Sequence, residues 1–141
     1  MKNEKKEVLY GEDAVKRVEE MEGRELSYPE RVVVMEEGFV NKPYEDEKGV
    51  ITYGVGQTGD WIDQPFSAAF AAHEEDARNM IEDYDYYPDD IKAAIMSAAY
   101  RGDLQQSPKF RKLFNAGDFQ AAADEFLNNK DYKQAKKKGS G

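Results

Sequence analysis

Two acidic residues of this 141-residue chain, Glu37 and Asp46, lie close in sequence but in unlike surroundings. Glu37 follows the apolar run Val32–Met35 at the end of a predicted helix, whereas Asp46 lies in a polar turn near Gly49. Hydrolysis of a glycosidic bond requires two carboxyl groups: one protonates the leaving oxygen, and the other activates a water or stabilises positive charge on the sugar. Apolar surroundings favour the protonated acid, and a polar turn keeps its partner ionised. The hydroxyl of Thr52, on the adjoining predicted strand, could hold the water.

The same acidic turn could instead be a calcium loop. With Gly49 at the sixth position of an EF-hand loop, Tyr44 would be first and Val55 twelfth, where oxygen ligands are required. That register fails, and we expect no metal site. A second group of acids is more simply a solvated loop; it comprises Glu82, Asp83, Asp85, Asp89 and Asp90.

Composition excludes several classes of function. The chain has no cysteine and one histidine, His73, so thiolate metal sites, cysteine nucleophiles and multi-histidine sites are impossible. The formal net charge is −9, and residues 31–90 carry 15 acidic and four basic side chains, which would repel nucleic acid. No apolar run approaches the roughly 20 residues of a membrane span, and the first ten residues lack a secretory signal's apolar stretch. His73 lies on an apolar helix face, where we expect a hydrogen-bonded structural role.

Local signals predict the elements that carry the acids. The first ten residues look disordered, and a short surface helix follows from Gly11 to Gly23. Ser27 and Glu30 have capping-box spacing and open a helix that runs to about Glu37. Glycine-punctuated β-formers between Pro43 and Thr58 predict a small antiparallel hairpin or meander.

Everything after Asp60 is predicted to be helical. Apolar residues recur at helical spacing along Phe66–Ile81. Further helices are expected from Pro88, from Ser107-Pro108 and from a capping Asp118. The helix from Pro88 should have a fully buried face formed by Ile91, Ala94, Ile95, Ala98 and Ala99. The predicted fold class is therefore α+β, with one helix, a small antiparallel sheet and then a helical lobe.

The segment from Glu37 to Thr58 closely resembles the catalytic segment of phage-type lysozymes, the muramidases of glycoside hydrolase family 24. The family pattern is Glu-Gly, Tyr-x-Asp, Gly and Thr-x-Gly-x-Gly. The chain matches it without a gap at Glu37-Gly38, Tyr44-Glu45-Asp46, Gly49 and Thr52-Tyr53-Gly54-Val55-Gly56. A weaker resemblance continues through Ser97–Leu127, so that about residues 29–130 are covered.

The resemblance implies a lysozyme-like fold, with a glycan cleft between the sheet and the helical lobe and with Phe66–Ile81 as the long connecting helix. It implies that Glu37 is the general acid and that Asp46 and Thr52 position the attacking water. The Gly38 neighbour and the spacing to Asp46 favour Glu37 over Glu36.

Aromatic and glycine positions complete the expected site. Substrate contacts are expected from Tyr44, Tyr53, Trp61 and Gln57, with core packing an equal alternative for Trp61. Structural glycines are expected at Gly38, Gly49, Gly54 and Gly56. Gly54 and Gly56 do not fit a phosphate loop, because neither a helix start nor a lysine follows; they should instead let the backbone turn and the substrate approach closely.

Three features depart from the family. Gln57 stands where histidine is common, and Tyr100-Arg101-Gly102 replaces a segment that often contains asparagine, so cleft contacts there are not carried over. The chain is acidic whereas such lysozymes are usually basic, which weakens electrostatic attraction to an anionic wall. This charge suggests tethering in a larger assembly or a salty environment.

The sequence thus predicts a muramidase that cleaves the β-1,4 bond between N-acetylmuramic acid and N-acetylglucosamine in peptidoglycan, without a metal or organic cofactor. Two alternatives are a non-catalytic wall-binding or virion module and a lytic transglycosylase. We expect an N-terminal extension over residues 1–26, a catalytic domain over 27–130 and a basic tail over 131–141. The isolated domain should be a monomer without membrane insertion, held in the host cytoplasm until holin-dependent release to the cell wall, or carried in a virion.

Overall fold

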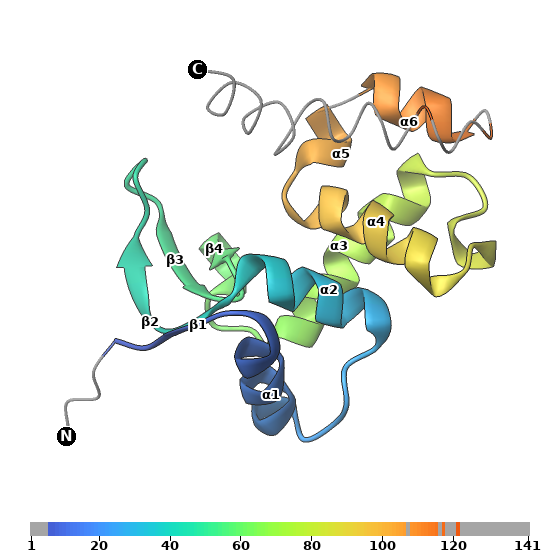
Figure 1. Cartoon of the computed structure of the whole chain (residues 1–141). Helices are drawn as coiled ribbons and strands as arrows, with labels where there is room; N and C mark the ends of the chain where they lie inside the picture. Colours follow the sequence, from blue (N-terminus) through green and yellow to red (C-terminus); the bar gives the residue numbers. More distant parts are fainter. Residues whose placement is uncertain (1–5, 107, 116, 118–120, 122–141) are drawn as a thin grey trace, which may run out of the picture.

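The computed structural model describes residues 6–106, 108–115, 117 and 121. A small sheet lies at one side of the molecule and a group of helices at the other, with the helix that ends at Glu37 between them (Figure 1). The fold is α+β, as the sequence predicts.

The sheet is antiparallel with strand order β1-β2-β3-β4. Its strands are β1 (Val8–Leu9), β2 (Phe39–Glu45), β3 (Ile51–Gly54) and β4 (Gln57–Thr58). Thr52 on β3 pairs with Tyr44 on β2 and with Thr58 on β4, so the candidate water-holding hydroxyl comes from a central strand. The register shifts between Val40 and Tyr44, just before the turn that carries Asp46.

Helix α2 (Tyr28–Glu37) begins with the predicted capping box. The Glu30 N–H donates to the Ser27 hydroxyl oxygen, and the Ser27 N–H donates to the Glu30 carboxylate. Both donors would otherwise have no partner within the helix. The box fixes where α2 starts, and therefore where its last residue, Glu37, lies.

The N-terminal segment is more ordered and more buried than the sequence predicts. Val8 and Leu9 form β1, which corrects the expectation of ten disordered residues; the pairing uses backbone groups and needs no apolar pattern. Helix α1 (Gly11–Glu22) is also more than a surface helix, because Ala14, Val15 and Val18 are buried in the core. Residues in the predicted extension therefore share one core with the rest of the chain.

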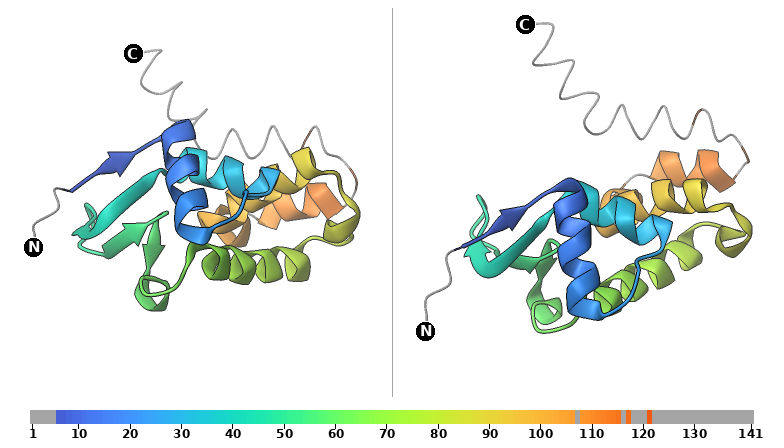
Figure 2. Two further views of the ribbon diagram at one scale, coloured as in Figure 1. Left: turned by 90° about the horizontal axis from the view of Figure 1, so that it is seen from below. Right: turned by 60° about the horizontal axis from the view of Figure 1, so that its bottom comes forward.

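Helix α3 (Phe66–Met80) runs from the sheet side along the helical part, as Figure 2 shows. The 3-10 turns η1 (Gly59–Trp61) and η2 (Tyr84–Tyr86) flank it, and the further helices are α4 (Asp89–Tyr100), α5 (Asp103–Gln106) and α6 (Pro108–Asn115). One predicted core position on α4 is wrong: Ala94 is exposed and Ala93 is buried, because α4 turns a neighbouring stripe inward. Ile91 there is only partly buried. The helix predicted from Asp118 lies outside the described residues.

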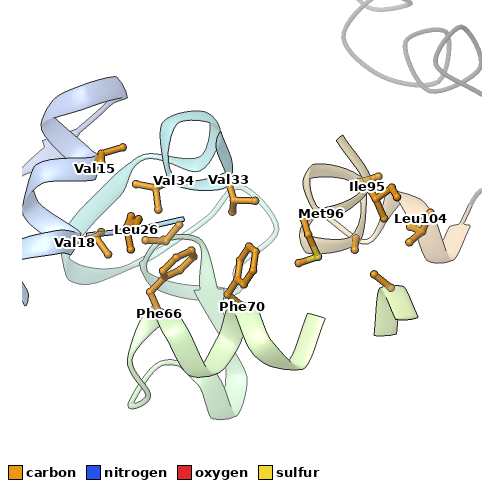
Figure 3. Packing of buried hydrophobic residues seen from close by; sticks show 14 of the residues in the cluster. Val15, Val18, Leu26, Val33, Val34, Phe66, Phe70, Ile95, Met96 and Leu104 are labelled. Carbon is orange, nitrogen blue, oxygen red and sulfur yellow. The ribbon is translucent and has the colours of Figure 1, made fainter. Parts of the chain in front are cut away.

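The core joins α1, α2, α3 and α4 in one cluster (Figure 3). Val15 and Val18 of α1 pack with Val34 and with Phe66 of α3, while Met96 of α4 lies toward Phe70. Helix α2 is thus fixed on several sides, which holds the candidate general acid at its end on a rigid element.

Candidate active site

Glu37 is the last residue of α2. The helix ends there because Gly38 adopts φ 76° while its N–H still donates to the Val34 carbonyl. A side chain at position 38 would collide with the β1 segment: a Cβ would lie 2.8 Å from the Leu9 carbonyl oxygen. Gly38 is therefore required both by its backbone conformation and by the strand that crosses it.

The Glu37 carboxylate lies against the turn between β3 and β4. A Cβ at Gly56, which has φ 63°, would lie 2.8 Å from Glu37 Oε1. The sequence predicts close approach of the substrate at this glycine, which stays a prediction; the group that the structure brings close to it is the Glu37 carboxylate. Gly54 has the same requirement toward Gln57 Oε1, at 2.7 Å, whereas Gly49 has φ 81° and open space around it.

Arg101 holds the other oxygen of this carboxylate. Its Nε donates to Glu37 Oε2 at 3.1 Å, and its Nη2 reaches Glu36 Oε1 at 3.4 Å. Ser97, one turn earlier on α4, donates its hydroxyl to the same oxygen of Glu36. Sequence reasoning set Arg101 aside as a departure from the family. The signal in the sequence that could have pointed to Arg101 is its positive charge directly after the apolar helix Asp89–Tyr100.

Tyr100 ties the helical part to the sheet beside Glu37. Its hydroxyl donates to the Val55 carbonyl at 2.6 Å. Burial, and then the negative charge of Glu37, raise the pKa of Tyr100, so it stays a neutral donor. The His73 ring lies 4.8 Å from the Tyr100 ring, and burial lowers the pKa of His73.

His73 differs from expectation in one respect. Its Nδ1 is buried and has no hydrogen-bond partner among the described residues, whereas a hydrogen-bonded histidine was expected. Packing against an aromatic ring, rather than a polar contact, explains its position on the inner face of α3.

Asp46 and Thr52 meet at the backbone of Val50. Asp46 Oδ1 accepts the N–H groups of Lys48 and Val50, at 2.8 and 2.9 Å. The Asp46 N–H and the Thr52 hydroxyl both donate to the Val50 carbonyl, at 2.9 and 3.2 Å. The turn thus fixes the carboxylate and the hydroxyl relative to each other.

The four predicted substrate contacts lie in different settings. Tyr44 is covered on one face by Lys6 Nζ, 4.7 Å from its ring centroid, and Trp61 is partly buried. Gln57 is 4% exposed, and its amide spans the β3–β4 turn, donating to the Trp61 and Gln64 carbonyls and accepting from the Val55 N–H. Gln57 therefore holds the turn that carries Gly56.

Tyr53 lies beside a cavity that is separate from Glu37. Its ring packs edge-on against Phe39, and it lines an open pocket of about 400 Å³ with residues of the α1 end and of the loop before α3. Glu37 does not line this pocket, so the glycan cleft expected at the acids stays a prediction.

Within the described residues, no group of three or more histidine, cysteine, aspartate or glutamate side chains is arranged to hold a metal ion. No helix in the described part of the chain is long and apolar enough to cross a membrane.

The model of the phage lysozyme family matches residues 34–140. The chain belongs to the phage lysozyme family. The match begins just before Glu37 and includes Asp46, Thr52 and Arg101, so all these residues of the site lie within it. No curated protein and no solved structure matches the chain. Membership confirms the resemblance seen in the sequence and indicates a peptidoglycan hydrolase of the glycoside hydrolase class.

Proposed function

We propose that this protein is a muramidase that hydrolyses the β-1,4 bond between N-acetylmuramic acid and N-acetylglucosamine. The proposal assigns Glu37 as the general acid and Asp46, with Thr52, as the group that positions and activates the attacking water. It assigns the protein to phage lysis of a host or to penetration of its wall, with peptidoglycan as the partner.

The contact between Glu37 and Gly56 carries this proposal. A general acid must be fixed within reach of the glycosidic oxygen and partly shielded from water. The Glu37 side chain is only 23% exposed, with the Gly56 backbone against one carboxylate oxygen and the Arg101 guanidinium on the other. A fully solvated carboxyl group would not lie this close to the Gly56 backbone.

The water would be held by two acceptors. Asp46 binds backbone N–H groups through Oδ1, which leaves Oδ2 to accept one water proton. Thr52 donates to Val50 and keeps lone pairs that accept the other. A water that donates both protons in this way presents its own lone pair to the anomeric carbon. As the C–O bond breaks, Glu37 protonates the leaving oxygen and Asp46 accepts the proton lost by the water, with inversion at that carbon.

Release of reducing ends from purified peptidoglycan by the Glu37→Gln and Asp46→Asn variants tests these roles. Each change is expected to lower the rate at least about 100-fold, because each removes a proton-transfer group. Glu45→Gln is the matched control, since Glu45 is the exposed neighbour of Asp46 at the end of β2. Comparable rates for Glu37→Gln and Glu45→Gln would contradict the assignment.

A further inference from the structure

One cation serves two carboxylates at this site. Arg101 contacts Glu37 through Nε and Glu36 through Nη2, and the Arg101 side chain is only 26% exposed. The Ser97 hydroxyl donates a hydrogen bond to Glu36, and no described contact joins Ser97 to Glu37. Consecutive residues of α2 are therefore anchored on Ser97 of α4 and on Arg101, which directly follows α4.

This arrangement answers a problem posed by the proposed chemistry. A general acid must carry a proton at the working pH, yet an adjacent guanidinium stabilises the ionised form of a carboxylate. If Arg101 faced Glu37 alone, protonation of Glu37 would leave the guanidinium without a counter-charge. Glu36 supplies that counter-charge, and its own negative charge next to Glu37 opposes ionisation of Glu37.

Two neighbouring elements place neutral groups beside Glu37. From α4 it faces Tyr100, whose raised pKa keeps it neutral, and the His73 ring of α3 packs against the Tyr100 ring. The β3–β4 turn contributes Val55 and Gly56, which carry no charge. Glu36 and Arg101 thus place one charge of each sign beside the acid.

We infer that Arg101 and Glu36 are positioning residues for the general acid: Arg101 fixes the Glu37 carboxylate against Gly56, and Glu36 offsets the guanidinium charge so that Glu37 holds its proton to higher pH. This inference rests on the proposed function. It predicts that the charges of Glu36 and Arg101 shift the ionisation midpoint of Glu37 in opposite directions.

Two neutral variants and their combination test this opposition. The ionisation midpoint of Glu37 is measured by carboxyl NMR in the substrate-free protein, and the pH profile of kcat/KM is measured on peptidoglycan. Glu36→Gln should move the midpoint and the basic limb of the profile down by about one pH unit, and Arg101→Gln should move both up by a similar amount. The double variant should return close to the wild-type midpoint, and Arg101→Lys should lie closer to wild type than Arg101→Gln.

Matched controls separate these effects from net charge and from unfolding. Glu75→Gln and Arg78→Gln make the same charge changes in an exposed ion-pair group on α3 and should leave the Glu37 midpoint unchanged. Thermal unfolding of every variant checks that the fold persists, and a double variant that unfolds leaves the two single variants to decide. Shifts in the same direction for Glu36→Gln and Arg101→Gln, or none in either, would overturn the inference while leaving an active wild type a muramidase. A wild type that releases no product would overturn the proposed function. Any shift in the Glu37 midpoint would then have no bearing on catalysis.

Discussion

Glu37 and Gly56 are in such close contact that a single methyl group at position 56 would lie 2.8 Å from the Glu37 carboxylate. The two residues come from different elements, the end of α2 and the turn between β3 and β4. Gln57 holds that turn from within, and Tyr100 holds it from α4 through the Val55 carbonyl. The position of the candidate acid therefore depends on backbone geometry in the sheet as much as on its own helix.

Gly56→Ala should impair activity more than it impairs stability. The Cβ would push the carboxylate away from Gly56 and would also be strained at φ 63°, at a cost of about 1–3 kcal/mol in unfolding free energy. Gly23→Ala is the matched control, because Gly23 has φ 69° with open space and lies at the end of α1. We expect similar stability losses by urea unfolding but a loss of at least about 10-fold in kcat for Gly56→Ala alone. Equal kcat values in the two variants would refute a role for this contact.

Thr52→Val should lower kcat by about 100-fold with little change in KM, because it removes one of the two acceptors for the water. The shape of the side chain is retained, so the strand register should persist. Thr58→Val alters the exposed threonine paired with Thr52 across β3 and β4 and should leave kcat unchanged. Steady-state kinetics on peptidoglycan distinguish the two; a Thr52→Val enzyme as fast as Thr58→Val would remove Thr52 from the mechanism.

The ionised Glu30 carboxylate should stabilise the fold at neutral pH and lose this effect in acid. Burial raises the pKa of Glu30, but the ion pair with Arg24 and the Ser27 N–H outweigh it, so the pKa is lowered below 4.5. The stabilisation is therefore present above about pH 4.5 and is lost as the pH falls through the lower folded-state pKa. Glu30→Gln should be less stable than wild type at pH 7, and the difference should narrow on acidification. Urea unfolding of the variant and the wild type at pH 7 and at an acidic pH measures the difference in unfolding free energy. Glu20→Gln, at an exposed position, is the control.

His73 should make the fold sensitive to mild acid. Burial lowers the pKa of His73 from 6.5, with a smaller opposing effect of Asp76, so the folded protein binds this proton less readily than the unfolded chain. The unfolding free energy should therefore fall as the pH drops below 6.5, until the folded-state pKa is passed. His73→Phe should lose less stability than wild type between pH 7.5 and pH 5. Equal losses would show that His73 is not protonated on unfolding in this range.

Sequence signals predicted an element well where the interactions that form it join residues close in sequence. The Ser27–Glu30 capping box and the Phe66–Ile81 periodicity each depend on neighbours within a few turns, and both are confirmed. The burial of α1 depends instead on tertiary packing against α2 and the rest of the core, which the pattern within one helix does not specify.

The same distinction applies to the site. The spacing from Glu37 to Thr52 is a local pattern, and it identified the segment that the family match now includes. The ion pairs of Arg101 join residues more than 60 positions apart, at separations of 64 and 65. No spacing rule within one sequence connects such residues, and the charge of Arg101 alone gave no partner.

The most direct test of the central claim is mass spectrometry of the products released from purified peptidoglycan by the wild type and by Glu37→Gln. The account predicts N-acetylmuramic acid with reducing ends from the wild type and at least about 100-fold less product from the folded variant. 1,6-Anhydro ends would instead mean a lytic transglycosylase. Retained wall binding without any product from the wild type would mean a non-catalytic module, and either result would contradict the account.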